Sequence, residues 1–127
     1  MKLLALAAAL CAAAAGCGYH DDNPHAAQVV AQAYLNAYTD RDPATVCRVL
    51  APEIVLAVAA NRPSCEAGIL LQLTKPHPRL TVGRASEAPS PPGNPRMFVS
   101  VREEPERMIE LGRYGSIWRV IYGGTPP

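Results

Sequence analysis

The chain has 127 residues, of which 49% are hydrophobic and 18% charged, and twelve basic and eleven acidic side chains give a net charge of +1. Without residues 1–16, which are set apart below, Lys2 is lost and the net charge falls to zero. A neutral chain with no basic run argues against nucleic-acid binding through a phosphate-neutralising surface. The remaining length suffices for one small domain and excludes a two-domain cofactor enzyme.

Residues 1–16 have the pattern of an export signal. Lys2 gives a positive start, and residues 3–15 form an uncharged apolar run that is too short to span a membrane, which takes about 20 apolar residues. The ending Ala14-Ala15-Gly16-Cys17 resembles the bacterial lipobox. That resemblance implies cleavage before Cys17 and acylation of its thiol, with palmitate as an expected chain. An ordinary secretory signal, cut after one of the alanines, is the alternative.

Residues 17–23 are polar and lack helical periodicity, which is typical of a tether between a lipid anchor and a folded domain. Each buried methylene of an acyl chain contributes about 0.8 kcal/mol, so several chains would hold the protein firmly in a bilayer. The sequence therefore predicts a cell-envelope lipoprotein that is secreted across the cytoplasmic membrane and anchored to its outer face. The folded domain is predicted to occupy residues 24–127.

The four cysteines divide into two groups. Cys11 leaves with the signal and Cys17 takes the lipid, so Cys47 and Cys65 remain as a pair in a compartment where disulfides persist. A bridge across this separation would stabilise the fold by about 3 kcal/mol in the chain-entropy model. A redox or metal-binding pair is the alternative, but the sequence has no Cys-x-x-Cys spacing and no nearby histidine to support it.

The first half of the domain is predicted to be helical. Asn23-Pro24 and Asp42-Pro43 each place a capping side chain before a proline, which favours helix starts at Pro24 and Pro43. The first helix has an apolar face and a polar face, and Leu35 falls on the polar side. The apolar face consists of Ala26, Val30, Ala33, Tyr34 and Ala37, and the polar face of Gln28, Gln32 and Asn36.

Two further helices are expected after the second one, which covers about residues 43–50. Residues 54–60 could be strand or helix on periodicity alone, but their alanines and the preceding Pro52 favour a helix. Ser64 is positioned to cap the next helix, whose buried side would consist of Ile69, Leu70 and Leu73. A bridge between Cys47 and Cys65 would then tie two helices together.

The second half has the alternation of antiparallel strands. Strands are predicted at residues 79–86, 96–103, 107–113 and 117–122, with a proline-rich loop at 88–95 and a turn at Glu104-Pro105-Glu106. In the last strand Trp118, Val120 and Tyr122 share one face. Helices followed by hairpin-linked strands indicate an α+β fold with an antiparallel sheet of about four strands.

This order of elements resembles the NTF2-like (cystatin-like α+β cone) superfamily. The resemblance rests on the long first helix, the short helix opened by Asp42-Pro43, a cysteine-containing helix and a meander ending in Trp118-Arg119-Val120. Residues 33–52 are also similar to small actinobacterial lipoproteins. The resemblance implies a curved sheet wrapped around the long helix, often enclosing a pocket. Some members of the superfamily are isomerases or dehydratases, and many only bind or dimerise.

The acidic residues do not favour catalysis. An isomerase-type site needs a carboxylate base in an apolar pocket, with a proton donor opposite it. Most acidic residues lie at element ends or in the turn at 103–106, and Glu110, inside a strand, is expected to face solvent. His20, His25 and His77 match no standard metal-ligand spacing. We therefore expect no enzyme, no cofactor and no metal.

The sequence favours a lipid-anchored binding or interaction module whose ligand enters between the first helix and the concave face of the sheet. Tyr34, Tyr38, Trp118 and Tyr122 are the candidate pocket residues, because their rings are amphipathic. A small apolar molecule or a protein is the expected ligand. Two alternatives remain: a small pocket enzyme of the same fold, and an accessory subunit that forms a homodimer through its sheet.

Overall fold

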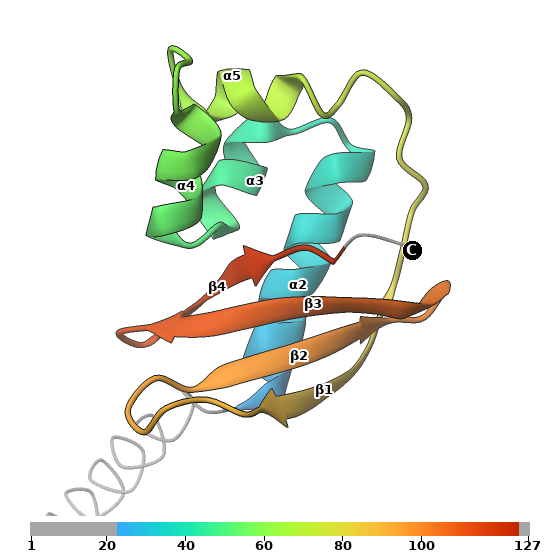
Figure 1. The fold of residues 1–127 in the computed structure, drawn as a ribbon. Coiled ribbons are helices and arrows are strands. Elements are labelled where there is room, and N and C mark those ends of the chain that lie inside the picture. Colours follow the sequence, from blue (N-terminus) through green and yellow to red (C-terminus); the bar gives the residue numbers. More distant parts are fainter. Residues whose placement is uncertain (1–22, 125–127) are drawn as a thin grey trace, which may run out of the picture.

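The computed structural model describes residues 23–124. Within them the chain is α+β, with four helices followed by four strands, as the sequence predicts (Figure 1). The elements are α2 (Pro24–Thr39), α3 (Pro43–Val49), α4 (Pro52–Ala59), α5 (Cys65–Leu70), β1 (Val82–Ala88), β2 (Arg96–Val101), β3 (Glu104–Tyr114) and β4 (Ile117–Tyr122). Residues 54–60, for which the pattern allowed strand or helix, lie mostly in α4.

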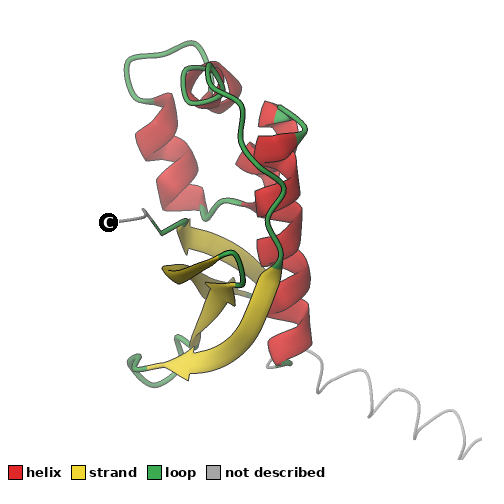
Figure 2. Ribbon diagram, turned by 90° about the vertical axis from the view of Figure 1, so that its right-hand side faces the viewer, coloured by secondary structure: helices red, strands yellow, loops and turns green. Residues whose placement is uncertain are grey.

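The strands form an open antiparallel meander in the order β1-β2-β3-β4. Figure 2 shows α2 against one face of this sheet, while no helix within residues 23–124 covers the other face. The side chains that point toward α2 alternate along the strands and include the fully buried Val99, Val101, Ile109, Leu111 and Val120. Burial of this alternating apolar set is what holds the sheet against the helix.

The turn between β2 and β3 differs from the predicted one. The hairpin turns at residues 102–103, and Glu104 already pairs with Val101. Pro105 lies in β3 where the register with β2 shifts, so its missing N–H removes no ladder hydrogen bond there. The first strand also starts later than predicted, at Val82 and not at residue 79.

The buried face of α2 is wider than the predicted stripe. Ala27 and Ala31 are fully buried and Leu35 is only 3% exposed, whereas Ala26, Val30 and Ala33 are only partly buried. The reason is that α2 contacts α3 as well as all four strands, so residues on two sides of the helix are covered. Leu35, which the periodicity places on the polar face, is therefore part of the core.

The polar face of α2 holds the edge of the sheet. The Gln32 amide donates to the Leu80 carbonyl (2.9 Å) and accepts from the Val82 N–H (3.0 Å), and Gln28 donates to the Gly83 carbonyl (2.8 Å). These side chains bond to the edge of β1 as a neighbouring strand would. At the other edge, the Ala51 N–H donates to the Val120 carbonyl of β4 (2.8 Å). Both edges of the sheet are thus partly occupied by the chain itself.

Helices α3, α4 and α5 form a layer beyond the β4 edge (Figure 1). A disulfide between Cys47 and Cys65 joins α3 to the start of α5, as predicted, and the Cα atoms lie 6.1 Å apart. Ser64 caps α5 by accepting from the Ala67 N–H (3.1 Å). Ile69 is buried as expected, but Leu70 is 53% exposed because it lies on the side of α5 that faces away from the core. Among residues 23–124, no helix has the length and apolar character to cross a membrane.

Candidate functional site

Two adjoining cavities meet at a pair of tyrosines on the last two turns of α2. The rings of Tyr34 and Tyr38 make an edge-to-face contact with centroids 5.0 Å apart, and both residues line both cavities. We call the combined space the tyrosine cleft. It lies at the end of α2 that is remote from the first helical residue, Pro24, beside the C-terminal end of β4.

One half of the tyrosine cleft is apolar. It has a volume of about 260 Å³ and lies between α4, α5 and the end of β4. Aliphatic side chains supply most of its wall: Leu50, Ile54, Val58, Ile69 and Ile121. Gly123 forms part of the same wall, and a side chain there would collide with the Tyr34 hydroxyl. This half can hold the hydrocarbon part of a small molecule.

The other half carries the charged side chains of the cleft. It measures about 330 Å³ and is lined by Gln72, His77, Glu104 and Arg107 besides the two tyrosines, with Leu35, Pro78 and Leu80 as its apolar wall. The Tyr38 hydroxyl donates to Gln72 Oε1 (2.7 Å), and the His77 ring lies edge-on to Tyr38 at 5.2 Å. Arg107 is held in place because its Nε donates to the Gly123 carbonyl (2.8 Å) and its Nη1 to Glu104 (3.2 Å).

Both tyrosines of this cleft keep their protons far above neutral pH. Burial raises the pKa of Tyr34, although a hydrogen bond with Tyr38 and the charge of Arg107 oppose that rise. Burial also raises the pKa of Tyr38, and the neighbouring Tyr34 adds to the effect. The two hydroxyls therefore stay protonated and are unsuited to act as bases, and because the Tyr38 proton is given to Gln72, Tyr38 offers a ligand only its oxygen as an acceptor.

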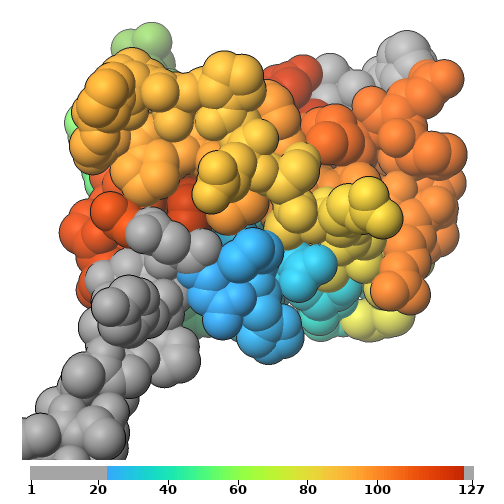
Figure 3. Space-filling model, turned by 90° about the horizontal axis from the view of Figure 1, so that it is seen from below, coloured from blue at the N-terminus to red at the C-terminus, as the bar shows by residue number. Residues whose placement is uncertain are grey.

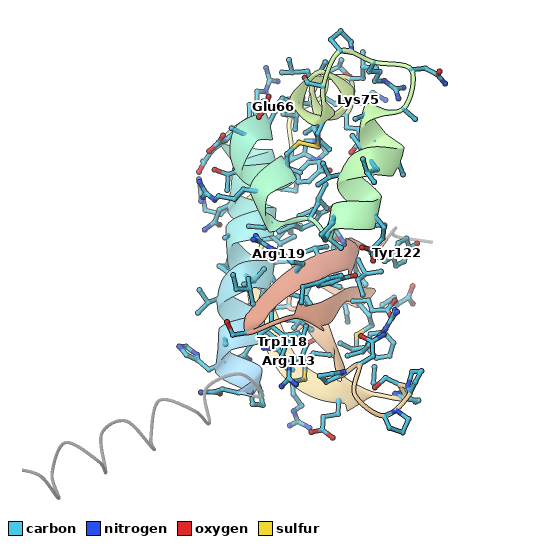
Figure 4. All side chains as sticks on the ribbon, turned by 90° about the vertical axis from the view of Figure 1, so that its left-hand side faces the viewer. Glu66, Lys75, Arg113, Trp118, Arg119 and Tyr122 are labelled. Carbon is cyan, nitrogen blue, oxygen red and sulfur yellow. A yellow bond between two sulfur atoms is a disulfide. The ribbon has the colours of Figure 1, made fainter. Side chains whose placement is uncertain are left out.

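Three of the four candidate pocket residues lie together in this cleft. Tyr34, Tyr38 and Tyr122 line its apolar half, and Tyr122 is 51% exposed at the rim (Figure 4). Trp118 does not line it, because β4 carries Trp118 to the opposite end of the sheet, where it is only 2% exposed. Simple alternation along β4 does not extend to Tyr122, because the register with β3 shifts between Val120 and Tyr122 and pairs Tyr122 with Glu110.

Sequence reasoning missed three polar residues of the cleft. The sequence pattern considers His77 only as a possible metal ligand, and it singles out neither Arg107 nor Gln72. Each lies far along the chain from Tyr38, and none belongs to a recognisable motif. The only local signal was the run of prolines around His77, which holds the chain extended beside α2.

Among residues 23–124, no group of three histidine, cysteine or acidic side chains is placed to hold a metal ion. Cys47 and Cys65 are bonded to each other, so in this state neither sulfur is a free thiolate that could hold a metal ion. The predicted lipidation site, Cys17, and the signal at residues 1–16 lie outside the described residues.

Comparison of the chain with known protein families, with curated proteins and with solved structures gives no match in any of the three.

Proposed function

We propose that this protein is a lipid-anchored binding module of the cell envelope, with an NTF2-like domain whose tyrosine cleft takes a small amphipathic molecule. The observation that carries the proposal is the division of the cleft into an aliphatic half and a half with protonated hydroxyl and guanidinium donors. A ligand with a hydrocarbon body and an oxygen acceptor at one end matches both halves.

Binding is favoured over catalysis by the way the polar groups of the cleft are occupied. Glu104, the carboxylate in the cleft wall, is paired with Arg107, so it is not an available base. His77 Nε2 lies 3.0 Å from the Gln72 carbonyl, a contact that takes up one of its two ring nitrogens. Both tyrosine hydroxyls stay protonated, because burial raises their pKa, and so neither serves as a base. A general base would need a free carboxylate or imidazole directed at the ligand.

Ile54 and Leu56 offer a matched test of the cleft. Both lie on α4, but Ile54 lines the apolar half whereas Leu56 is 74% exposed and lines neither half. Native mass spectrometry of the protein extracted from its own membrane is expected to show a bound small molecule in the wild type and in Leu56→Trp. In Ile54→Trp the indole fills the apolar half, so the ligand is lost. Equal retention of the ligand in both variants would rule out this cleft as its site.

The membrane anchor requires a separate test because Cys17 lies outside the described residues. In the wild type we expect partitioning into detergent and an intact mass that includes acyl chains. Cys17→Ala should abolish both. An unchanged mass in the variant would refute the anchor while leaving the cleft untouched.

The accessory-subunit alternative is favoured by one observation, the face of the sheet that no helix covers. Ile117 and Met108 are 49% and 37% exposed on it. A second copy that packs there would give a dimer that weakens on dilution. Analytical ultracentrifugation of the wild type and of Ile117→Glu tests this; a monomer at every concentration in both would reject the dimer.

A further inference from the structure

A separate cavity lies at the other end of the sheet, beneath the proline-rich loop between β1 and β2. It has a volume of about 380 Å³ and is walled by Pro91, Pro92, Met97, Arg113 and Trp118, with Glu87 and Arg96 as its remaining charged residues. We call it the proline-loop cavity. It shares no lining residue with the tyrosine cleft. The loop and the start of α2 lie at the same end of the molecule (Figures 1 and 3).

Trp118 carries a hydrogen-bond donor that the described residues leave unused. Its side chain is buried, and the indole Nε1–H has no partner within residues 23–124. Buried polar groups are nearly always hydrogen-bonded, because water has been lost and an unmade bond is unfavourable. Trp118 also lines the cavity, so an acceptor that enters there and reaches the buried indole would satisfy this donor.

Arg113 stands directly beside this donor. Arg113 and Trp118 are cross-strand partners of β3 and β4, so their side chains leave the sheet on the same face (Figure 4). A guanidinium group has five N–H donors and can serve several acceptors at once. Arg96 also lines the cavity and pairs with Glu110 on the other face of the sheet (2.9 Å). The cavity is therefore lined by two guanidinium groups and an indole, close to a thioether and proline rings.

The loop that covers the cavity is weakly held. Within 89–95, four of the seven residues are prolines, which have no N–H to donate. Backbone hydrogen bonds hold it at two points, one from Asn94 N–H to the Pro91 carbonyl and one from Arg113 N–H to the Pro95 carbonyl. A shift of the loop tip therefore breaks few hydrogen bonds and would admit a ligand to the indole.

We propose that the proline-loop cavity binds a carboxylate with an aliphatic tail, such as a medium-chain fatty acid. The carboxylate accepts from Trp118 Nε1–H and from the Arg113 guanidinium, a pairing of charged groups that is stronger than a neutral hydrogen bond. The tail packs against Met97, Pro91 and Pro92. This site is independent of the tyrosine cleft and does not require that the cleft bind anything.

Trp118 is the only tryptophan of the chain, so its indole N–H gives a single resonance in a proton–nitrogen correlation spectrum. Titration of the isotope-labelled protein with sodium octanoate should shift that resonance in a saturable manner, and 1-octanol, which has the tail without the charge, should bind at least about tenfold more weakly. Arg113→Gln should lower the octanoate affinity about tenfold. Arg84→Gln, which removes an exposed arginine of β1 that does not line the cavity, should leave it unchanged.

Trp118→Phe keeps an aromatic ring but removes the donor, and calorimetric titration should show an octanoate affinity that is also about tenfold lower. If this variant does not fold, the comparison of octanoate affinity between Arg113→Gln and Arg84→Gln still tests the proposal. An indole resonance that octanoate leaves in place, or that octanol moves equally, would overturn the proposal, since a water molecule would then be the sole partner of the N–H. Because the resonance reports on this cavity alone, a negative result would leave the tyrosine cleft untested.

Discussion

Gln32 is predicted to be the most important polar side chain for the attachment of β1 to α2. Its amide bonds to the carbonyl of Leu80 (2.9 Å) and to the N–H of Val82 (3.0 Å), at partly buried positions. Gln32→Ala removes both bonds and a third one, from Gln32 Nε2 to Asn36 Oδ1 (3.0 Å), and leaves two backbone groups without partners. Each lost bond lowers the free energy of unfolding by about 0.5–1.5 kcal/mol, and by more where the remaining group stays buried. We therefore expect the free energy of unfolding to fall by about 2–3 kcal/mol. For a domain of about 100 residues, this lowers Tm by roughly 8–20 °C.

The matched variant is Gln28→Ala, because Gln28 makes a single bond to the same strand, with the Gly83 carbonyl (2.8 Å). Gln28→Ala should lower the free energy of unfolding by about 1 kcal/mol. Gln32→Glu keeps the acceptor for Val82 N–H but sets a carboxylate against the Leu80 carbonyl. The stability that Gln32→Glu loses relative to the wild type should become smaller below about pH 4, because the protonated carboxyl group can donate a hydrogen bond to the Leu80 carbonyl. The measurement is urea unfolding followed by circular dichroism. If Gln32→Ala is no more destabilising than Gln28→Ala, apolar packing holds β1 and the reasoning is wrong.

Three further predictions concern stability. Replacement of Cys47 and Cys65 together by alanine should cost about 3 kcal/mol in urea unfolding, and reductant should destabilise the wild type but not the variant. Bonds from Thr45 hold the pKa of Asp42 below its ordinary value of 3.8, so its stabilising effect is complete above about pH 5 and is lost as the pH falls through the lowered pKa. The Tm difference between wild type and Asp42→Ala should therefore shrink as the pH falls below 3.8; a constant difference would contradict this. Tyr34 and Tyr38 have a folded-state pKa above the ordinary 10.0, so the stability that they carry is full below that pH and is lost above it. Phenolate absorbance during alkaline titration should show them ionising together with unfolding, and earlier ionisation in a folded chain would refute their burial.

Local chemistry in the sequence was enough to predict where most elements begin. Asn23, Asp42 and Ser64 each accept a backbone N–H at the start of a helix, and the last strand covers residues 117–122 as predicted. These signals can be read because a cap, a proline or an alternating run acts within a few residues. The pairing of Cys47 with Cys65 was predictable for another reason, since the other two cysteines were assigned to the signal and the anchor.

Features that depend on two or more neighbours could not be read in this way. Leu35 is buried because α2 contacts a sheet and a helix layer at once, and one-stripe periodicity assumes a single partner. The local pattern places Gln32 on a solvent-facing side of its helix, because its partner Val82 lies 50 positions later in the chain. The same holds for the tyrosine cleft, in which Arg107 meets Tyr34 only because β3 returns beside α2.

The two cavities lie at different distances from the predicted lipid. Tyr34 and Tyr38 lie 10 and 14 residues after Pro24, so about 15–21 Å of helix separates them from the start of α2, where the tether joins. A tether from Cys17 to Asn23 spans at most about 20 Å. On the proposed anchoring, the proline-loop cavity therefore faces the bilayer, a source of aliphatic carboxylates, and the tyrosine cleft faces the aqueous envelope.

Pro92 and Leu71 test this orientation, because both are exposed and they lie at opposite ends of the molecule. With a fluorophore attached at Pro92→Cys or Leu71→Cys in the vesicle-bound lipoprotein, lipid-borne quenchers should act more strongly at position 92. A water-soluble quencher should show the reverse order. Equal quenching at both positions would mean that the domain tumbles freely on its tether, and the two cavities would then draw on the same pool of ligands.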